Sequence, residues 1–422
     1  MSSPQPHVLI AGAGIAGPAL AILLNKNGFK TTIVERAPGI RTAGQQVDLV
    51  GPGIEAVRFM GVEQAIRDMT VHDEGLKFVD ENDYAFGTFP VSDSVNSPVR
   101  EIEILRGDMG KIFYEATKEK TESLFDDRIT GLAEKPDHIT INFKNSPDRD
   151  FDVVVAADGL GSRTRELAFG KPKEAYVKNI PGVIGTFMIP WIESDGDFSR
   201  IHTEPGVNIL LRPNRAKKQT SAYLIRSETK EEHEIIGQPE EQQKAVLKRI
   251  FTGLGWEVPR MLDELEKTTT FYLLQTAQVK MDSWVKGRVV VLGDAGYSPS
   301  GLTGLGTTAA VVGAHMLAGC LITHAPDLKA GLEQYERDMR PFVKEAQKLI
   351  PGVPGIANPK TAWGVWTMNN AIRTADFLRR TGVFTALTFA FTPVSWVLTA
   401  AGVTGGGAGE TKLPVYEKML KP

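Results

Sequence analysis

The stretch HVLIAGAGIAGPALAILLNKNGFKTTIVER, residues 7–36, decides the fold. Residues 7–11 form a short apolar run that predicts a buried strand, and residues 18–27 form an apolar run long enough for a helix. Between them stands the G-x-G-x-x-G turn of Gly12, Gly14 and Gly17. Gly28 ends the helix, and a second strand runs to Glu35. This order of strand, glycine turn, helix, strand and acid is that of a βαβ nucleotide-binding unit.

Each glycine of the turn has its own physical role. Gly12 permits the tight turn, Gly14 lets the backbone approach a pyrophosphate, and Gly17 lets helix and strand pack closely. The helix N-terminus offers N–H groups and a positive dipole end to phosphate, and Glu35 lies where an acid binds ribose hydroxyls. The candidate cofactor-binding residues of this unit are Gly12, Gly14, Ile15, Ala16, Gly17, Glu35 and Arg36. The unit alone does not separate NAD from FAD, since both contain an ADP half.

The composition limits the class of protein. A chain of 422 residues is long enough for two or three domains. The formal net charge of −3 gives no reason to expect a nucleic-acid partner. The single cysteine, Cys320, cannot build a disulfide framework or a thiolate metal site, and we expect no metal. The first residues lack the pattern of a secretory signal, so we expect a reducing, cytoplasmic location.

Two later stretches repeat the pattern of a buried strand followed by Gly and Asp. DFDVVVAADGLGSRTRELAFG (150–170) turns at Asp158-Gly159, and VVVLGDAGYSPSGLTGLGTTAAVVGAHMLAG (289–319) turns at Gly293-Asp294. The loop after Asp294 contains no His, Cys or Lys, so it is suited to binding rather than to nucleophilic chemistry. We expect a buried helix to begin at Thr307. If the Asp158 turn were only a turn, Arg163 and Arg165 would be solvated helix residues.

These three motifs, in this order and at these separations, resemble a known family. A fourth match is EILRGDMGKIFYEA (103–116), with Arg106 and Asp108 before a helix. The chain resembles FAD-dependent group A flavoprotein monooxygenases of the para-hydroxybenzoate hydroxylase fold. It is most similar to the tetracycline-degrading and secondary-metabolite members, and the resemblance covers roughly residues 7–350. The resemblance implies an α/β fold: a Rossmann-type, three-layer FAD-binding domain, an inserted β-sheet substrate domain and a C-terminal helical segment.

The resemblance assigns roles to individual residues. Glu35 would hold the adenosine ribose, and Arg106 would lie over the isoalloxazine or the pyrophosphate. Asp158 would support FAD and briefly NADPH, and Asp294 would bind the ribitol chain or the pyrophosphate. The backbone of Gly304, Leu305, Gly306 and Thr307 would face the flavin N1/O2 edge, and the loop 41–49 would pass the flavin with Gly44, Gln46 and Asp48 as candidates. Ordinary loop polarity is an equal explanation for Gln46 and Asp48.

The implied reaction is the insertion of one oxygen atom into a small apolar substrate, aromatic or polycyclic. FAD would be reduced by NADPH or NADH and would react with O2 through a flavin C4a-hydroperoxide. Hydroxylation, epoxidation and Baeyer–Villiger insertion remain open, as does the oligomeric state. The alternatives are a flavin halogenase, a polyprenyl reductase, or a flavin-binding protein that sequesters a ligand without turnover.

The resemblance also implies a division of the chain. Residues 1–75, 100–175 and 276–350 would form the FAD-binding domain, and residues 76–99 and 176–275 the substrate domain. On the β-like segments of the latter, Arg212, Tyr223 and Arg226 are candidates to position substrate, with sheet-edge polarity as the alternative. His202 and Asn208 are weaker candidates. Many relatives carry Ala-Ala-His after the Gly-Asp pair where this chain has Ala-Gly-Tyr, so Tyr297 is a further candidate, either to support its loop or to reach the substrate cavity.

Residues 351–422 would form a bridging helix and an apolar tail. NPKTAWGVWTMNNAIRTADFLRR (358–380) predicts a long helix whose aromatic side chains face the core. Residues 381–409 contain no charged side chain. Pro393 divides this run, which favours packing against the domains, while peripheral membrane attachment and a membrane span are the two alternatives.

Overall fold

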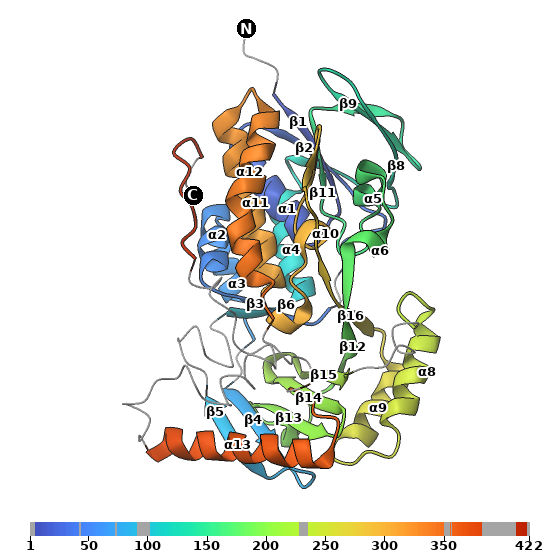
Figure 1. The fold of residues 1–422 in the computed structure, drawn as a ribbon, viewed down its shortest axis with the longest axis vertical. Helices are drawn as coiled ribbons and strands as arrows, with labels where there is room; N and C mark the ends of the chain where they lie inside the picture. The colour runs from blue at the N-terminus through green and yellow to red at the C-terminus, as the bar shows by residue number, and fades with distance from the viewer. Residues whose placement is uncertain are drawn as a thin grey trace.

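The computed structural model describes residues 5–41, 44–71, 74–90, 102–227, 235–349, 355, 357–381 and 411–419. Figure 1 shows two domains, one above the other, with the chain passing between them several times. We call the upper one, which holds both ends of the described chain, the nucleotide domain. The lower one, built on a large mixed sheet, is the sheet domain. The mixed α/β architecture confirms the predicted fold class.

The nucleotide domain is built on a six-stranded sheet in the order β17-β18-β11-β1-β2-β7. The strands are β17 (Val285–Lys286), β18 (Val289–Val291), β11 (Val153–Ala156), β1 (His7–Ala11), β2 (Lys30–Val34) and β7 (Thr121–Leu124). All pairs are parallel except β17 with β18. The strands β1, β11 and β18, which precede the three motifs, are therefore neighbours, and their carboxyl ends meet at one edge.

Alternate residues of β1 enter two different cores, which makes the domain three-layered. Val8 and Ile10 pack with the helices, while Leu9 and Ala11 pack with a three-stranded antiparallel sheet. That sheet consists of β8 (Ile129–Glu134), β9 (Ile139–Phe143) and β10 (Arg149–Phe151). The helices of the domain are α1 (Ala16–Lys26), α2 (Pro52–Met60), α3 (Glu63–Arg67), α4 (Arg106–Thr117), α5 (Arg163–Phe169), α6 (Lys173–Tyr176), α10 (Asp294–Tyr297), α11 (Gly306–His324) and α12 (Leu328–Ala346). A two-stranded sheet of β3 (Gln46–Leu49) and β6 (Ile102–Leu105) lies toward the sheet domain (Figure 1).

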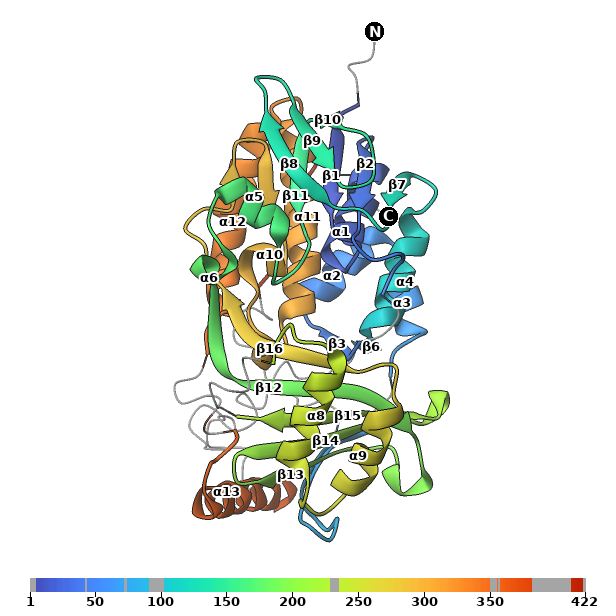
Figure 2. The same cartoon turned by 90° about the vertical axis from the view of Figure 1, so that its right-hand side faces the viewer.

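The sheet domain has seven strands in the order β16-β12-β15-β14-β13-β4-β5. They are β16 (Tyr272–Val279), β12 (Val177–Pro190), β15 (Gln219–Arg226), β14 (Val207–Asn214), β13 (Ser199–Glu204), β4 (Gly75–Val79) and β5 (Ala85–Pro90). On one face, Ile209, Leu211 and Leu224 pack on α8 (Glu240–Phe251) and α9 (Val258–Lys267). Because side chains alternate along a strand, Arg212 and Tyr223 lie on the opposite face. Figure 2 shows α8 and α9 over the first face.

The last long helix, α13 (Ala362–Thr381), packs chiefly on β5 and β13 of the sheet domain. Met368 and Ile372, one turn apart, are buried against Leu76, Phe78 and Ile201. The prediction that its aromatic residues face the core is wrong: Trp363, Trp366 and Phe377 are exposed. Their spacing along the helix places them on the side opposite Met368 and Ile372, whose side chains are buried against the sheet. The predicted apolar tail, residues 382–409, lies outside the described residues.

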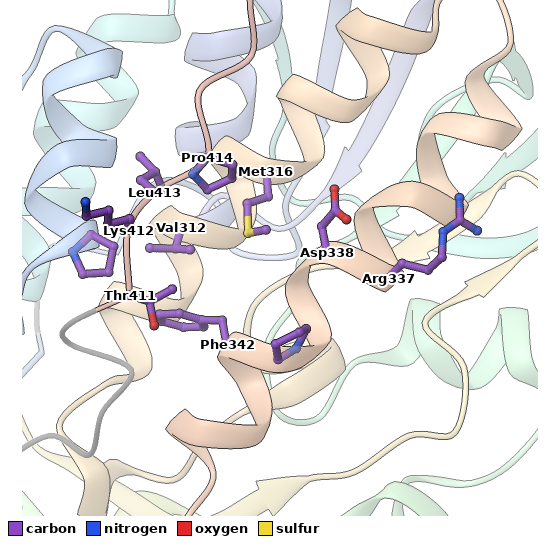
Figure 3. Close-up of a pocket in the computed structure, with 11 residues that line it drawn as sticks. Val312, Met316, Arg337, Asp338, Phe342, Thr411, Lys412, Leu413 and Pro414 are labelled. Atoms are coloured by element: carbon purple, nitrogen blue, oxygen red, sulfur yellow. The ribbon is translucent and has the colours of Figure 1, made fainter.

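The C-terminal segment, residues 411–419, lies along α11 as a strap. Leu413 and Met419 join the core of the nucleotide domain, and Lys418 donates to the Thr323 carbonyl at 2.7 Å. The strap closes one side of a pocket of about 470 Å³ between α11 and α12. Figure 3 shows Val312, Met316 and Phe342 around this pocket. In the part of the chain described, α11 is the one helix long and apolar enough to cross a membrane, and it is mostly buried within the protein.

A buried arginine holds two of the motif loops together. Arg165, in the first turn of α5, is fully buried. Its guanidinium donates to the Ala295 carbonyl at 2.7 Å and to the Leu160 carbonyl at 3.0 Å. Burial lowers the pKa of Arg165, but an arginine remains charged in proteins. The interpretation of this residue as a solvated helix residue is wrong, because the loops after β11 and β18 fold over it.

We predict that Arg165→Met lowers the free energy of unfolding by about 2–4 kcal/mol, since two charge-assisted hydrogen bonds are lost and two carbonyls lose their donor. Urea titration of both variants, followed by tryptophan fluorescence, measures this. The matched control is Arg163→Met two residues earlier, whose side chain is 73% exposed and whose loss should change stability little. Equal stabilities of the two variants would contradict the assignment.

The strap also gives the protein a pH-dependent contact. His315 on α11 packs between the rings of Phe59 and Tyr416, and its Nε2 lies 2.9 Å from the Pro414 carbonyl. Burial lowers the pKa of His315 from 6.5 to about 4. The unfolded chain therefore binds more protons than the folded chain between these two values, and stability falls as the pH falls from 6.5 toward 4.

We predict that His315 contributes about 2 kcal/mol of this loss at pH 5. Urea unfolding of wild type and His315→Gln at pH 7.5 and pH 5 measures it, with the stability difference between the two pH values smaller in the variant. His324→Gln at the end of the same helix is the control and should behave as wild type. A variant with the full wild-type pH dependence would show that His315 does not titrate as described.

Candidate functional site

The three motif loops meet at the carboxyl edge of the parallel sheet with no room for side chains. Gly12 has φ 110°, and a Cβ there would lie 2.5 Å from the Ala157 carbonyl oxygen. A Cβ on Gly17 would lie 2.1 Å from the Gly12 oxygen. Both positions thus require glycine for close backbone packing. At Gly14, in contrast, the nearest atom to a Cβ would be the Arg106 Nη2 at 3.4 Å, so the backbone is less crowded on this side. We call the space bordered by this turn, Glu35, Arg106 and Asp294 the groove.

Glu35 is fixed beside the glycine turn. One oxygen of its carboxylate accepts the Ala13 N–H at 2.9 Å, and the other accepts the Ala37 N–H at 2.9 Å. Each oxygen keeps a lone pair for a further donor. The half-buried carboxylate can therefore accept hydrogen bonds from a pair of ribose hydroxyls. It lies beside the glycine turn, as the βαβ motif predicts. Arg36, the next candidate, is exposed at the end of β2.

Arg106, the first residue of α4, lies across the groove. Its side chain covers Gly44 as well as Gly14, with 3.2 Å between its Cβ and the position of a Cβ on Gly44. Burial lowers the pKa of Arg106, as does Arg41, while Asp294 and Glu35 act in the opposite direction. The guanidinium thus places one positive charge between two carboxylates, which suits a pyrophosphate or a negatively charged ring edge.

Asp294 borders the same groove. Its side chain is accessible to solvent, yet desolvation by the surrounding protein raises the pKa of its carboxyl, which Ser298 and Arg106 oppose. A carboxylate that is enclosed and still accessible faces a space that a ligand can fill. Gly293 before it has φ 63° and lies against α1, so α10 starts close to the glycine turn.

Two glutamines hold the loop after Asp294, and no motif in the sequence had singled them out. Gln347 Nε2 lies within hydrogen-bond distance of the Val279, Tyr297 and Ser298 carbonyls, at 2.7–3.3 Å. Gln278 Nε2 donates to the Pro299 carbonyl at 3.1 Å. The loop then delivers Gly304, Leu305, Gly306 and Thr307 to the start of α11. Helix α11 begins at Gly306, one residue before the predicted start at Thr307, and its N-terminus directs the positive end of the helix dipole toward the loop.

Asp158 follows the end of β11 at the same edge of the sheet, and its role toward FAD stays a prediction. Its carboxylate accepts the Thr164 N–H at 3.1 Å and the Thr164 hydroxyl at 3.0 Å, and it also bonds the Ser162 hydroxyl. These contacts cap the N-terminus of α5. Asp158 therefore shapes the loop that packs on Gly12, and its oxygens are already engaged within the protein.

Tyr297 does not reach the sheet domain. It is buried, its hydroxyl lies 2.8 Å from that of Tyr335 on α12, and its ring packs on Trp284. A Cβ on Gly313 would lie 2.0 Å from the Tyr297 oxygen. The residue that departs from the family pattern thus fills a space between α10, α11 and α12. It is a packing residue of the nucleotide domain, and these contacts favour the first of its two alternative roles, support of the loop, over contact with substrate.

Arg212 and Tyr223 do lie where the two domains meet. The Gln46 N–H donates to the Tyr223 hydroxyl at 3.3 Å, and burial raises the pKa of Tyr223 to about 12. Arg212 forms an ion pair with Glu103 on β6. Glu103 is buried and was missed, because nothing in the sequence separates it from other strand residues. The Gln46 side-chain amide is buried without a partner among the described residues, which marks it as a group that a ligand would satisfy.

The remaining candidates have structural partners or lie aside. Asp48 is the register partner of Glu103 in the β3–β6 pair. His202 lies near the Val79 carbonyl and Glu204, and Asn208 bonds Thr203 and the Ala357 carbonyl. Arg226 lies half-buried at the end of β15. For His202, Asn208 and Arg226, no contact with the paired strands β3 and β6 is among those described.

Comparison with known proteins shows the family to which the chain belongs. The family model "FAD binding domain" matches residues 5–349. The chain is 34% identical over 386 residues to the FAD-dependent monooxygenase asL6 of Sarocladium schorii, covering 86% of this chain and 91% of the relative. It is 34% identical over 409 residues to the monooxygenase CTB7 of Cercospora beticola, covering 92% and 96%. With asL4 of S. schorii it shares 31% identity over 99% of this chain and 100% of the relative.

Solved structures show the same fold. The tetracycline destructase Tet(51) superposes with a TM-score of 0.75 at 25% identity, covering 98% of this chain and 100% of that one. HpxO of Klebsiella pneumoniae, solved with FAD and uric acid, has a TM-score of 0.73 at 19% identity, covering 95% and 97%. With the bare glycine backbone, Glu35, Arg106 and Asp294 in one groove, the residues present fit FAD. The chain belongs to the FAD-binding-domain family of flavoproteins and is an FAD-dependent monooxygenase.

Proposed function

We propose that the protein uses NADPH or NADH and O2 to insert one oxygen atom into a small apolar substrate, aromatic or polycyclic. The observation that carries this is the position of Arg212 and Tyr223, on the sheet face that meets the β3–β6 pair. Their register neighbours on that face are Leu210, Thr186 and Ser221, which carry no charge. Two structural neighbours, the tetracycline destructase Tet(51) and HpxO solved with uric acid, are named with ring compounds, which supports a ring substrate.

FAD supplies the redox and oxygen chemistry when bound. The residues that would hold it are the turn of Gly12 to Gly17, Glu35, Arg106 and Asp294, together with the N-terminus of α11. The positive dipole end of α11 would stabilise negative charge on the ring edge nearest to it. No side-chain nucleophile is needed, and the described groove offers none.

The two polar residues of the sheet would orient the substrate. Tyr223, whose pKa is about 12, keeps its proton at neutral pH and is therefore a hydrogen-bond donor to a substrate oxygen. Arg212 offers further donors, while Glu103 holds its guanidinium in place. The buried surroundings would exclude water, so that the oxygen atom is transferred to carbon rather than lost as peroxide.

A cytoplasmic site of action suits the lone thiol, Cys320, which is buried with its pKa raised to about 11.

The reaction is tested by isotope labelling of the FAD-loaded protein. Candidate ring metabolites are screened for stimulation of NADPH and NADH oxidation, and active mixtures are repeated under oxygen-18 gas. We expect substrate-dependent oxidation and one labelled oxygen atom in the product. Reduced substrate without label would indicate a reductase, a halide-dependent product a halogenase, and a bound but unchanged ligand a sequestering protein.

For the substrate anchor, we predict that Arg212→Met lowers kcat/KM by about 10–100-fold and raises the share of peroxide formed, because an orienting ion is lost. Because this variant leaves Glu103 buried without a cation, Arg212→Met with Glu103→Gln is tested beside it. FAD absorbance should stay at the wild-type level in both. Lys218→Met, at the exposed turn after β14, is the matched control. Wild-type coupling in the double variant would contradict the role of Arg212.

A further inference from the structure

The outer side of α13 presents a stripe of large aromatic side chains to solvent. Trp363 is 74% exposed, Trp366 62% and Phe377 64%. Their separations of 3 and 14 residues place all three on one side of the helix. Met368 and Ile372, on the other side, are buried against the sheet. We call the exposed side, with Trp363, Trp366 and Phe377, the aromatic stripe.

This stripe differs from the other exposed apolar residues of the described chain. The rest are single side chains on separate elements: Met69, Tyr84, Leu167, Ile192, Tyr272 and Val415. Single exposed apolar residues are normal on protein surfaces, whereas a contiguous group marks an interaction site. Two of the three residues of the stripe are tryptophan, a residue that is enriched at membrane–water interfaces.

The charges beside the stripe are basic. The helix and its approach carry Lys360, Arg373, Arg379 and Arg380, and the one acid among residues 358–381 is Asp376. Asp376 is buried and paired with Arg379 and Arg380. The Arg373 guanidinium lies 5.0 Å from the centre of the Phe86 ring, at the edge of the sheet. An aromatic stripe flanked by arginines is the composition of a helix that lies on an anionic membrane surface.

The sequence that follows α13 favours lipid over a second protein. From Gly382 to Gly409 the chain has no Asp, Glu, Lys or Arg and includes Phe384, Phe389, Phe391 and Trp396. Thr381 ends the helix, and this uncharged length of chain follows it directly in the sequence. A protein partner would require only the stripe, whereas a lipid surface accounts for both features.

We propose that the aromatic stripe of α13 docks the protein on an anionic lipid bilayer, with the helix parallel to the surface. Trp363, Trp366 and Phe377 lie at the level of the headgroups, and Arg373 and Arg380 face the lipid phosphates. Figures 1 and 2 place α13 at the end of the molecule opposite the nucleotide domain. Docking there leaves the nucleotide domain on the side away from the bilayer.

The test uses the full-length, FAD-loaded protein and sedimentation with vesicles of phosphatidylcholine and phosphatidylglycerol. Wild type should sediment with the vesicles. The variant Trp363→Ser, Trp366→Ser, Phe377→Ser should lose at least about fivefold in bound fraction, since its apolar contact area is removed. The substituted side chains are exposed, so flavin absorbance and melting temperature should not change. Leu167→Ser on α5 of the nucleotide domain, also an exposed apolar residue, is the matched control and should bind as wild type.

Three outcomes would overturn the proposal. Wild type that stays in the supernatant has no affinity for such a surface. A triple variant that binds as wild type would place the binding outside α13. A concentration-dependent dimer seen by analytical ultracentrifugation, lost in the triple variant and without vesicle binding, would make the stripe an interface between two copies. As an independent readout, brominated lipid should quench the tryptophan fluorescence of wild type more than that of Trp363→Phe with Trp366→Phe.

Discussion

The structure depends on one close contact between backbone segments at the carboxyl edge of the parallel sheet. Gly12 turns directly against the Ala157 carbonyl, and Gly17 turns against Gly12, at distances that leave no space for a Cβ. This contact sets the glycine turn beside the Asp158 loop, and the pairing of β11 with β18 brings the Asp294 loop to the same edge. Arg165 then fixes the loops after β11 and β18 to each other through their carbonyls. The FAD groove is what remains open once these segments have met.

The charges of the groove follow from this arrangement. Glu35 and Asp294 come from the ends of two different strands, and Arg106 enters between them from the start of α4. The sheet domain closes the remaining side, with Tyr223 bonded to the backbone of the β3–β6 pair and Arg212 paired to Glu103. One set of contacts thus joins the cofactor groove to the face that we propose for the substrate.

The local motifs were predictable because their physics is local. The βαβ unit, the start of α11 and the place of Glu35 depend on residues close together in sequence. Asp158 and Asp294 show the limit of such reasoning, since both stand beside glycine after an apolar strand. Ser162 and Thr164 follow Asp158 within one turn and bind its carboxylate, whereas Asp294 lies open toward Arg106. Local sequence could not predict three features whose partners lie far along the chain: the burial of Arg165, the Glu103–Arg212 pair and the direction of the Tyr297 side chain. It also could not predict which side of α13 packs on the sheet, and therefore which of its aromatic residues are exposed.

The central claim is that bare glycine backbone, Arg106 and two carboxylates form an FAD site. The most direct measurement is a titration of the purified apoprotein with FAD, followed by absorbance and by calorimetry. The account predicts one FAD per chain, with a protein-bound flavin band at about 450 nm, and a weaker complex in Gly14→Val, whose side chain would enter the groove. A protein that stays colourless in excess FAD, or a Gly14→Val variant that binds FAD as tightly as wild type, would contradict it.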